Sequence, residues 1–204
     1  MQNIKNIIFD LGGIILNIDF KQTELAFAEL GVGNFNQYYT LQSVSPLFEK
    51  LELGLITPEA FYDEFRTVVK VSLTNEQIRD AWNALLLDFP AERIQFLEAL
   101  NKKYKIYLLS NTNKIHYDAF IKIFDEQTGK GDFNKYFIKP YYSHEINLRK
   151  PNKECFEFVL KKENLNAEET LFIDDSETNV EAAKTVGLNT IHLPSPHTIL
   201  ELGL

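Results

Sequence analysis

The sequence predicts an α/β protein in which a parallel sheet is flanked by helices and a small helical block is inserted after the first strand. Ile7, Ile8 and Phe9 form an unbroken apolar run that ends in Asp10, as expected of a strand buried on both faces of a parallel sheet. From residue 90 onward, short apolar runs alternate with amphipathic segments. Residues 17–89 carry helical patterns and no strand pattern, so we expect them to form a separate bundle.

Composition limits the possible functions of the chain. Its 204 residues are 45% hydrophobic, which suits one compact domain or a core with a modest insertion. The formal net charge of -8 argues against nucleic acid and anionic membranes as main partners, but it allows a small anionic substrate. The single cysteine, Cys155, excludes an internal disulfide and fits a reducing compartment. With no signal-peptide pattern and no apolar run of about 20 residues, we expect a cytoplasmic protein.

Helix signals in the inserted segment set its expected elements. Gly31 follows an amphipathic run, Thr57 and Pro58 form an N-cap followed by a proline, and Thr74 and Gln77 form a capping box. Helices are therefore expected over residues 20–30, 35–41, 46–53, 59–70 and 74–87.

The remainder of the chain predicts strands that alternate with helices. Strands are expected over residues 106–109, 137–142, 170–173 and 190–193, and helices over 91–102, 115–125, 151–163 and 176–186. Residues 127–134 and 146–150 are expected to be loops. Pro140 removes a backbone donor, so the strand that contains it is expected near a sheet edge. This alternation predicts parallel strands joined by right-handed crossovers.

Polar residues follow several of the predicted strands. Asp10 follows the first, Ser110 and Asn111 the second, and Asp174 and Asp175 the fourth, while Lys150 precedes a predicted helix. Because parallel strands end at one edge of a sheet, these groups are expected to converge on one pocket.

Together these side chains suit the handling of a phosphoryl group. Asp10 is an isolated carboxylate that could attack phosphorus, and Ser110 opens a helix whose free N–H groups favour a phosphate. Lys150 supplies positive charge, and Asp174 and Asp175 supply oxygen ligands suited to Mg²⁺. Each group alone also has a structural explanation: a helix cap, a solvated lysine or a strand-end turn. The combination in one chain favours the chemical interpretation.

The chain resembles the haloacid dehalogenase (HAD) superfamily of Mg²⁺-dependent phosphohydrolases over essentially its whole length. The second motif of the family is matched by Leu109-Ser110-Asn111-Thr112, and the lysine motif by Arg149-Lys150-Pro151. The first is matched by Phe9-Asp10-Leu11-Gly12-Gly13, and the fourth by Phe172-Ile173-Asp174-Asp175-Ser176 with Asn179. Within the superfamily, Asn111-Thr112-Asn113 and Leu148-Arg149-Lys150-Pro151 are most similar to the bacterial α-D-glucose-1-phosphate phosphatase type.

The resemblance implies a Rossmann-like catalytic core over residues 1–16 and 90–204 and a C1-type helical cap over residues 17–89. It implies that Asp10 is the nucleophile and that Ser110, Asn111 and Lys150 hold the phosphoryl group. It also implies a magnesium site formed by Asp10, the Gly12 carbonyl, Asp174 and Asp175. The expected substrate is a small phosphorylated metabolite, most simply a sugar phosphate.

Gly12 departs from the pattern of the family. Most phosphatases of the superfamily carry a second Asp at this position, where it protonates the leaving oxygen and then activates water. General acid and base catalysis is typically worth about 10²–10⁴ in rate. A sugar 1-phosphate, with its better leaving group, would need the proton less. Asp19, at the entrance to the inserted helices, is a candidate replacement, although it also suits a helix N-cap.

Three functions therefore remain open from the sequence. The first is a Mg²⁺-dependent phosphohydrolase that forms an aspartyl phosphate on Asp10. The second is a 2-haloacid dehalogenase, which also uses an Asp nucleophile without a second Asp, but which has no use for the paired acids Asp174 and Asp175. The third is a non-catalytic protein that binds a phosphorylated metabolite, for which Gly12 is the main support.

Overall fold

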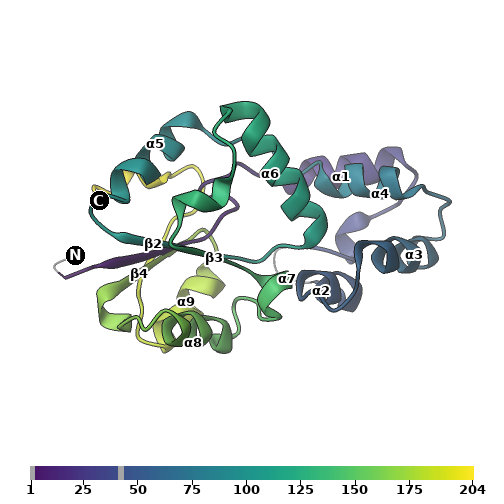
Figure 1. Cartoon of the computed structure of the whole chain (residues 1–204). Coiled ribbons are helices and arrows are strands. Elements are labelled where there is room, and N and C mark those ends of the chain that lie inside the picture. Colours follow the sequence, from purple (N-terminus) through teal and green to yellow (C-terminus); the bar gives the residue numbers. More distant parts are fainter. Residues whose placement is uncertain (1–2, 41–43) are drawn as a thin grey trace.

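The computed structural model describes residues 3–40 and 44–204 and contains a five-stranded parallel sheet (Figure 1). The strand order is β3-β2-β1-β4-β5, so the predicted α/β class is confirmed. Pro140 lies in β3, an edge strand, as its missing donor predicts. The strands are β1 (Asn6–Phe9), β2 (Lys105–Ser110), β3 (Lys139–Tyr142), β4 (Thr170–Asp174) and β5 (Asn189–His192).

Strand β1 lies in the centre of the sheet, hydrogen-bonded to β2 and β4. Phe9, its last residue, is level with Leu108 of β2 and Ile173 of β4. The next residue, Asp10, donates its backbone N–H to the carbonyl of Ile173 at 2.9 Å. The register therefore brings the chain beyond all three strands to the same edge of the sheet.

Helices cover both faces of the sheet (Figure 1). Ile7 and Phe9 pack on one face with α5 (Ala91–Leu100) and α6 (Lys114–Thr128). Ile8 points the other way and packs with α8 (Lys153–Lys162) and α9 (Glu177–Thr185). This alternation follows from the two-residue repeat of a strand, and it explains why β1 is apolar throughout.

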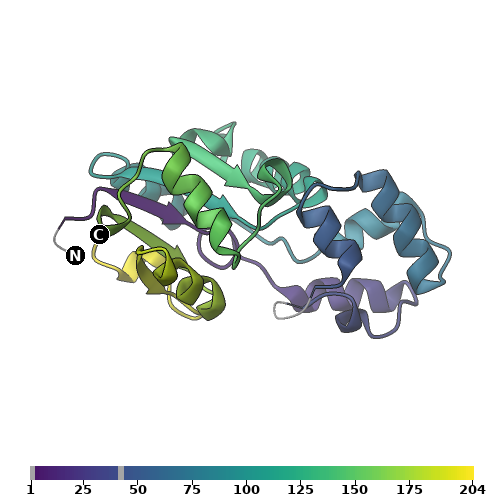
Figure 2. The ribbon, with the colours of Figure 1, turned by 90° about the horizontal axis from the view of Figure 1, so that it is seen from below.

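The inserted segment forms a helical block beside the carboxyl edge of the sheet (Figure 2). Its helices are α1 (Phe20–Glu29), α2 (Pro46–Glu52), α3 (Pro58–Val69) and α4 (Asn75–Asn83). Thr57 caps α3, and Thr74 forms the predicted capping box of α4. The block has an aromatic cluster of its own, in which the most deeply buried side chains are Phe27, Phe48, Phe61, Phe65 and Trp82.

The two linkers between the block and the sheet run side by side. Asn17 and Leu87 are joined by a backbone hydrogen bond of 3.0 Å, and Ile18 forms an antiparallel bridge with Leu86. The predicted helix over residues 74–87 therefore ends early, at Asn83, because the residues after it pair with the first linker.

Two other local predictions differ from the structure. The helix expected over residues 35–41 is wrong: Phe35–Gln37 form one 3₁₀ turn, and Tyr39 instead bridges to Val44. The last residue of that expected helix lies outside the described residues. The loop expected over residues 146–150 begins one residue later, because Ile146 is the last residue of a short helix, α7 (Ser143–Ile146), which follows β3 and ends at Asn147 in the left-handed region. Further 3₁₀ turns are Phe133–Tyr136, Ala167–Glu169 and Ile199–Glu201.

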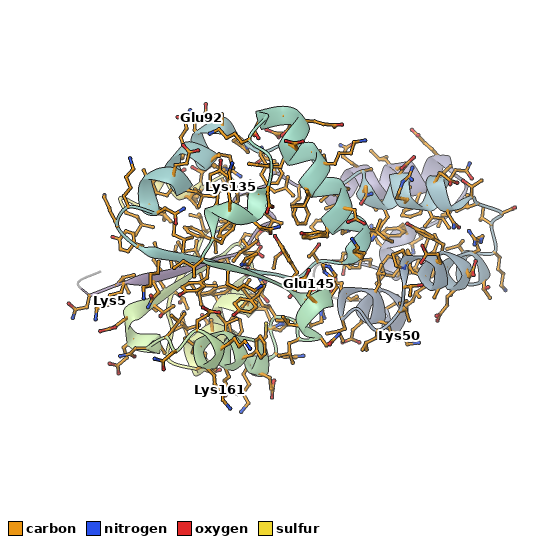
Figure 3. All side chains as sticks on the ribbon, in the orientation of Figure 1. Lys5, Lys50, Glu92, Lys135, Glu145 and Lys161 are labelled. Atoms are coloured by element: carbon orange, nitrogen blue, oxygen red, sulfur yellow. The ribbon has the colours of Figure 1, made fainter. Side chains whose placement is uncertain are left out.

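Charged side chains stand on the outer surfaces of the molecule, as Figure 3 shows for Lys5, Glu92 and Lys161. Within residues 3–40 and 44–204, no helix has the length and apolar character needed to cross a bilayer.

Candidate active site

The carboxyl ends of the three central strands bring the predicted polar groups together. Ser110 is the last residue of β2, Asp10 follows β1, and Asp174 is the last residue of β4. All three are nearly inaccessible to solvent, and Asp174 is 0% exposed. In parallel α/β sheets this edge is where ligands bind.

Lys150 joins two of these strand ends. Its Nζ lies 2.7 Å from Asp10 Oδ1 and 2.6 Å from Asp174 Oδ2, and only 1% of the residue is exposed. A buried ammonium is costly unless it is paired and hydrogen-bonded. The two carboxylates meet that requirement, and the pairing links residues that are 140 and 24 positions apart in the chain.

Asn111 fixes the backbone of Lys150. Its Oδ1 accepts the Lys150 N–H at 2.9 Å, and its Nδ2 donates to the Lys150 carbonyl at 2.8 Å. This pair of bonds ties the segment before α8 to the end of β2. The lysine is therefore aimed at the strand ends by its own main chain as well as by its carboxylate partners.

Asp174 is held by the start of α9 as well as by Lys150. Its Oδ1 accepts the backbone N–H of Ser176 at 2.8 Å, and Asn179 Nδ2 donates to both carboxylate oxygens at 3.1 Å. Ser176 also caps α9. These bonds fix the carboxylate in one orientation. Asn179, which belongs to the fourth motif, is therefore a site residue that the sequence expectations do not include.

Three carboxyl groups lie close enough to share a cation. Asp10, Asp174 and Asp175 each offer an oxygen within 4.8 Å of the others. The pKa of Asp10 is raised to about 7, mainly by burial; Lys150 opposes this rise, and the charges of Asp174 and Asp175 contribute to it. Burial and the charge of Asp174 likewise raise the pKa of Asp175 to about 6.

Lys150 stays protonated in this setting. Burial alone would lower its pKa, but the adjacent Asp10 and Asp174 carboxylates outweigh burial and raise the pKa above its ordinary value. One ammonium among three carboxylates leaves an excess of negative charge. Hard oxygen ligands with unbalanced negative charge are what Mg²⁺ prefers, so the cluster is compatible with binding it.

Gly13 allows the backbone to approach Asp175 closely. Its φ is +74°, a conformation that L side chains rarely adopt, and a Cβ added there would lie 2.5 Å from Asp175 Oδ2. Only glycine meets both conditions. Gly12 differs, because its φ is ordinary and an added Cβ would meet only the end of the Ile18 side chain, at 2.9 Å.

A pocket lies between this edge of the sheet and the helical block. Gly12, Ser110 and Asn111 line it on the sheet side, and Tyr39 and Glu52 line it from the block. The rest of its lining is mostly apolar: Leu11, Leu16, Ile18, Phe20, Leu85, Leu86 and Phe120, together with Thr112 and His116. The pocket thus joins the predicted phosphate-binding residues to the inserted segment.

The predicted residues divide by position. Asp10, Lys150, Asp174 and Asp175 form the charged cluster, while Gly12, Ser110 and Asn111 line the adjoining pocket. Asp19 is different: its carboxylate is exposed and accepts the Lys21 N–H as the N-cap of α1. That geometry supports its structural interpretation.

Glu52, Tyr39 and His116 also line the pocket, although the sequence motifs do not predict them as site residues. The one available signal was an acidic residue, Glu52, at a position of α2 that the helix buries. Nothing in the local pattern marked Tyr39, which reaches the pocket through the packing of the helical block.

The match to a known family covers most of the chain. Residues 4–187 match the model of the haloacid dehalogenase-like hydrolases. The protein belongs to this family. The resemblance predicted from the four motifs is therefore confirmed, and so is the prediction that the chain is a hydrolase enzyme.

Three proteins place this HAD-like hydrolase among its relatives. A D-ribitol-5-phosphate phosphatase from Bacteroides thetaiotaomicron is 31% identical over 187 residues, covering 92% of this chain and 90% of the relative. A HAD family enzyme from the same species, crystallised as wild-type protein with magnesium and inorganic phosphate, has a TM-score of 0.89 and 35% identity, covering 98% and 100% of the two chains. The L-2-haloacid dehalogenase of Xanthobacter autotrophicus, at 18% identity and a TM-score of 0.61 over 93% and 77%, shares the fold.

Proposed function

We propose that this protein is a Mg²⁺-dependent phosphatase that hydrolyses a small phosphorylated sugar or sugar alcohol through an aspartyl phosphate on Asp10. The observation that carries the proposal is the convergence of Asp10, Asp174, Asp175 and Lys150 at one edge of the sheet. A relative named D-ribitol-5-phosphate phosphatase supports the substrate class. A second relative, named as a sesquiterpene phosphatase, supports only the reaction.

The metal site in this proposal consists of the three carboxylates and the backbone carbonyl of Gly12. The donor set fits Mg²⁺, because it offers oxygen ligands and an excess of negative charge within a small volume. A similar enzyme crystallised with magnesium and inorganic phosphate supports the same choice. When bound, the cation would offset the mutual repulsion of the carboxylates and neutralise charge on the phosphoryl group.

Asp10 attacks the phosphorus atom in the first proposed step. A carboxylate oxygen of Asp10 forms a new bond to phosphorus while the bond to the substrate oxygen breaks, and the leaving oxygen takes a proton from solvent water. In the second step, water attacks the aspartyl phosphate and gives its proton to the hydroxide left in solvent; the bond from Asp10 to phosphorus breaks, inorganic phosphate leaves, and the Asp10 carboxylate is regenerated. Ser110, Asn111 and Lys150 hold the phosphoryl oxygens through hydrogen bonds and charge during both steps.

The proposed domain division follows from the same assignment. Residues 1–16 and 90–204 form the catalytic core, and residues 17–89 form the cap that closes over the pocket. The separate aromatic cluster of α1–α4 supports this division, as do the two paired linkers at residues 17–19 and 85–88. Closure of such a cap excludes water from the reacting groups. The lone, buried Cys155 fits a cytoplasmic location, which is part of the proposal.

The test is phosphate release from a panel of sugar phosphates, sugar-alcohol phosphates, nucleotides and phospho-amino acids, with and without EDTA. We expect phosphate release that stops when EDTA removes the metal and that is nearly abolished in Asp10→Asn. Asp80→Asn, an exposed acid in the helical block, is the matched control and should match the wild type. Binding without turnover across the panel would favour the non-catalytic alternative, and halide release from 2-haloacids without metal would favour the dehalogenase.

A further inference from the structure

Glu52 is a buried carboxylate in the helical block, far in sequence from the predicted motifs. It is 2% exposed at the end of α2. Tyr39 donates its hydroxyl to Glu52 Oε1 at 2.7 Å, and Arg149 Nη2 lies 2.8 Å from Glu52 Oε2. Burying a carboxylate is costly unless partners hold it, and here two segments of the chain provide them.

The position of Glu52 beside the pocket distinguishes its pairing with Arg149 from an ion pair that serves only the structure. Glu52 and Tyr39 are both part of the pocket lining among the described residues, and Arg149 is not. Glu52 therefore borders the pocket, and Arg149 contacts its carboxylate from outside the lining. The wall on the sheet side carries Ser110 and Asn111, which hold the phosphoryl group in the proposed function. A substrate whose phosphate rests on that wall would extend its carbon chain toward Glu52.

The chemistry of Glu52 defines what it can bind. An ionised carboxylate accepts about four hydrogen bonds, and the two partners leave acceptor sites free. Burial raises the pKa of Glu52 above its ordinary value, and the opposing effects of Arg149 and Tyr39 offset only part of that rise. Hydroxyl groups can donate to such a carboxylate, whereas a second phosphate or a carboxylate on the substrate would be repelled.

We propose that Glu52, oriented by Tyr39 and Arg149, binds hydroxyl groups on the substrate chain and selects polyol monophosphates that carry no second negative group. This inference rests on the proposed phosphatase function of the same pocket. It predicts discrimination against substrates that lack hydroxyls and against those that carry a second negative group. A site built to bind hydroxyls rejects analogues without them, because its buried polar atoms are then left unpaired.

The experiment compares two phosphates with the same kind of leaving group. Ribitol 5-phosphate and pentyl phosphate are both primary esters of a five-carbon chain, and they differ in the hydroxyl groups. The ratio of their kcat/KM values measures recognition of the hydroxyls independently of leaving-group chemistry. In Glu52→Gln this ratio should fall at least about tenfold, the loss expected for hydrogen bonds to a charged group. Tyr39→Phe, which removes only an orienting bond, should lower the ratio by less.

The control is Glu49→Gln, an exposed acid on the same helix, which should keep the wild-type ratio. A ratio in Glu52→Gln equal to that of the wild type would overturn the proposal. The proposal is also overturned if kcat/KM falls by the same factor for both substrates in Glu52→Gln, because Glu52 would then act on folding or on proton transfer. Phosphorylated sugar acids, which carry a carboxylate, should gain relative to ribitol 5-phosphate in Glu52→Gln.

A binding measurement separates this proposal from the phosphatase assignment. Calorimetry measures the binding of ribitol 5-phosphate and of pentyl phosphate to Asp10→Asn and to the double variant Asp10→Asn, Glu52→Gln. Because neither variant is expected to turn over substrate, the two affinities give the preference for hydroxyl groups directly. Tighter binding of ribitol 5-phosphate that disappears with Glu52→Gln supports the role of Glu52 even if the wild type releases no phosphate. Equal binding of the two ligands to Asp10→Asn would overturn that role, whatever the wild type hydrolyses.

Discussion

The ammonium nitrogen of Lys150 lies 2.6 Å from Oδ2 of Asp174, and the two side chains are 1% and 0% exposed. The contact joins a loop before α8 to the end of β4. Asp10 contacts the same ammonium, so Lys150 pairs with acids that follow or end two neighbouring strands. The charge balance of the site therefore depends on Lys150 whenever no divalent cation is bound.

Replacement of Lys150 by methionine should destabilise the metal-free protein. The variant keeps a side chain of similar length but leaves Asp10 and Asp174 buried without a counter-charge, which costs about 3–5 kcal/mol in the free energy of unfolding. Urea denaturation measured in EDTA gives that value. Lys153→Met, at an exposed lysine, is the control and should leave the midpoint unchanged. An unchanged midpoint for Lys150→Met would contradict the importance of the pairing.

Gly13→Ala should weaken the binding of Mg²⁺. The new Cβ would meet Asp175 Oδ2 at 2.5 Å, so the carboxylate must move away from its partners. Displacing a group that supports a metal site typically costs about 10–100-fold in affinity. Calorimetric titration with Mg²⁺ measures the loss. Gly129→Ala is a matched control, since Gly129 also has a positive φ, of +62°, but has nothing within 4 Å of an added Cβ. Equal affinities in the two variants would contradict the role assigned to Gly13.

Gly12→Asp should raise kcat on alkyl phosphates. The backbone at Gly12 accepts a side chain, and the nearest obstacle is the flexible end of Ile18. A carboxyl group two residues after the proposed nucleophile could transfer a proton to the leaving oxygen, a contribution of about 10²–10⁴ in favourable cases. Gly12→Asn has nearly the same shape without the acid and serves as the control. The absence of any gain over Gly12→Asn would mean that another group already transfers this proton.

His116 should contribute to acid sensitivity. Burial lowers its pKa from 6.5 to about 3, while in the unfolded chain the imidazole titrates near its ordinary value. Between these two values the unfolded chain binds a proton that the folded protein does not. The free energy of unfolding therefore falls as the pH is lowered through this range, by at most about 1.4 kcal/mol per pH unit from this group.

The measurement is the slope of stability against pH in His116→Gln. Urea denaturation between about pH 7 and about pH 4 should show a shallower decline in the variant than in the wild type, since the glutamine binds no proton. A wild-type slope in His116→Gln would show that the buried imidazole does not contribute.

The sheet and most helices were predictable from local patterns. The apolar run before Asp10 identified the central strand, and Pro140 placed β3 at the edge, because each effect lies in the residues themselves. Helix ends were less predictable. The end of α4 at Asn83 depends on pairing with a linker more than sixty residues away, and the bridge from Tyr39 to Val44 replaces an expected helix.

The charged cluster was predictable for a related reason. Parallel strands end at one edge, so carboxylates that follow separate strands must approach one another. Glu52 illustrates the limit of this reasoning. Its burial depends on Tyr39 and Arg149, which come from other segments, and its own helix shows only an acid on a buried face. No residue spacing in the sequence predicts that Glu52, Tyr39 and Arg149 contact one another.

The separate aromatic cluster of the helical block has a consequence for how this molecule can change. Phe48 and Phe61 pack against each other within the block, while Ile7 and Phe9 pack with helices beside the sheet. Mutations in the interior of the helical block can therefore accumulate without disturbing the packing of the sheet. A lineage could change its substrate by changing residues of the helical block while it keeps the charged residues at the carboxyl edge of the sheet.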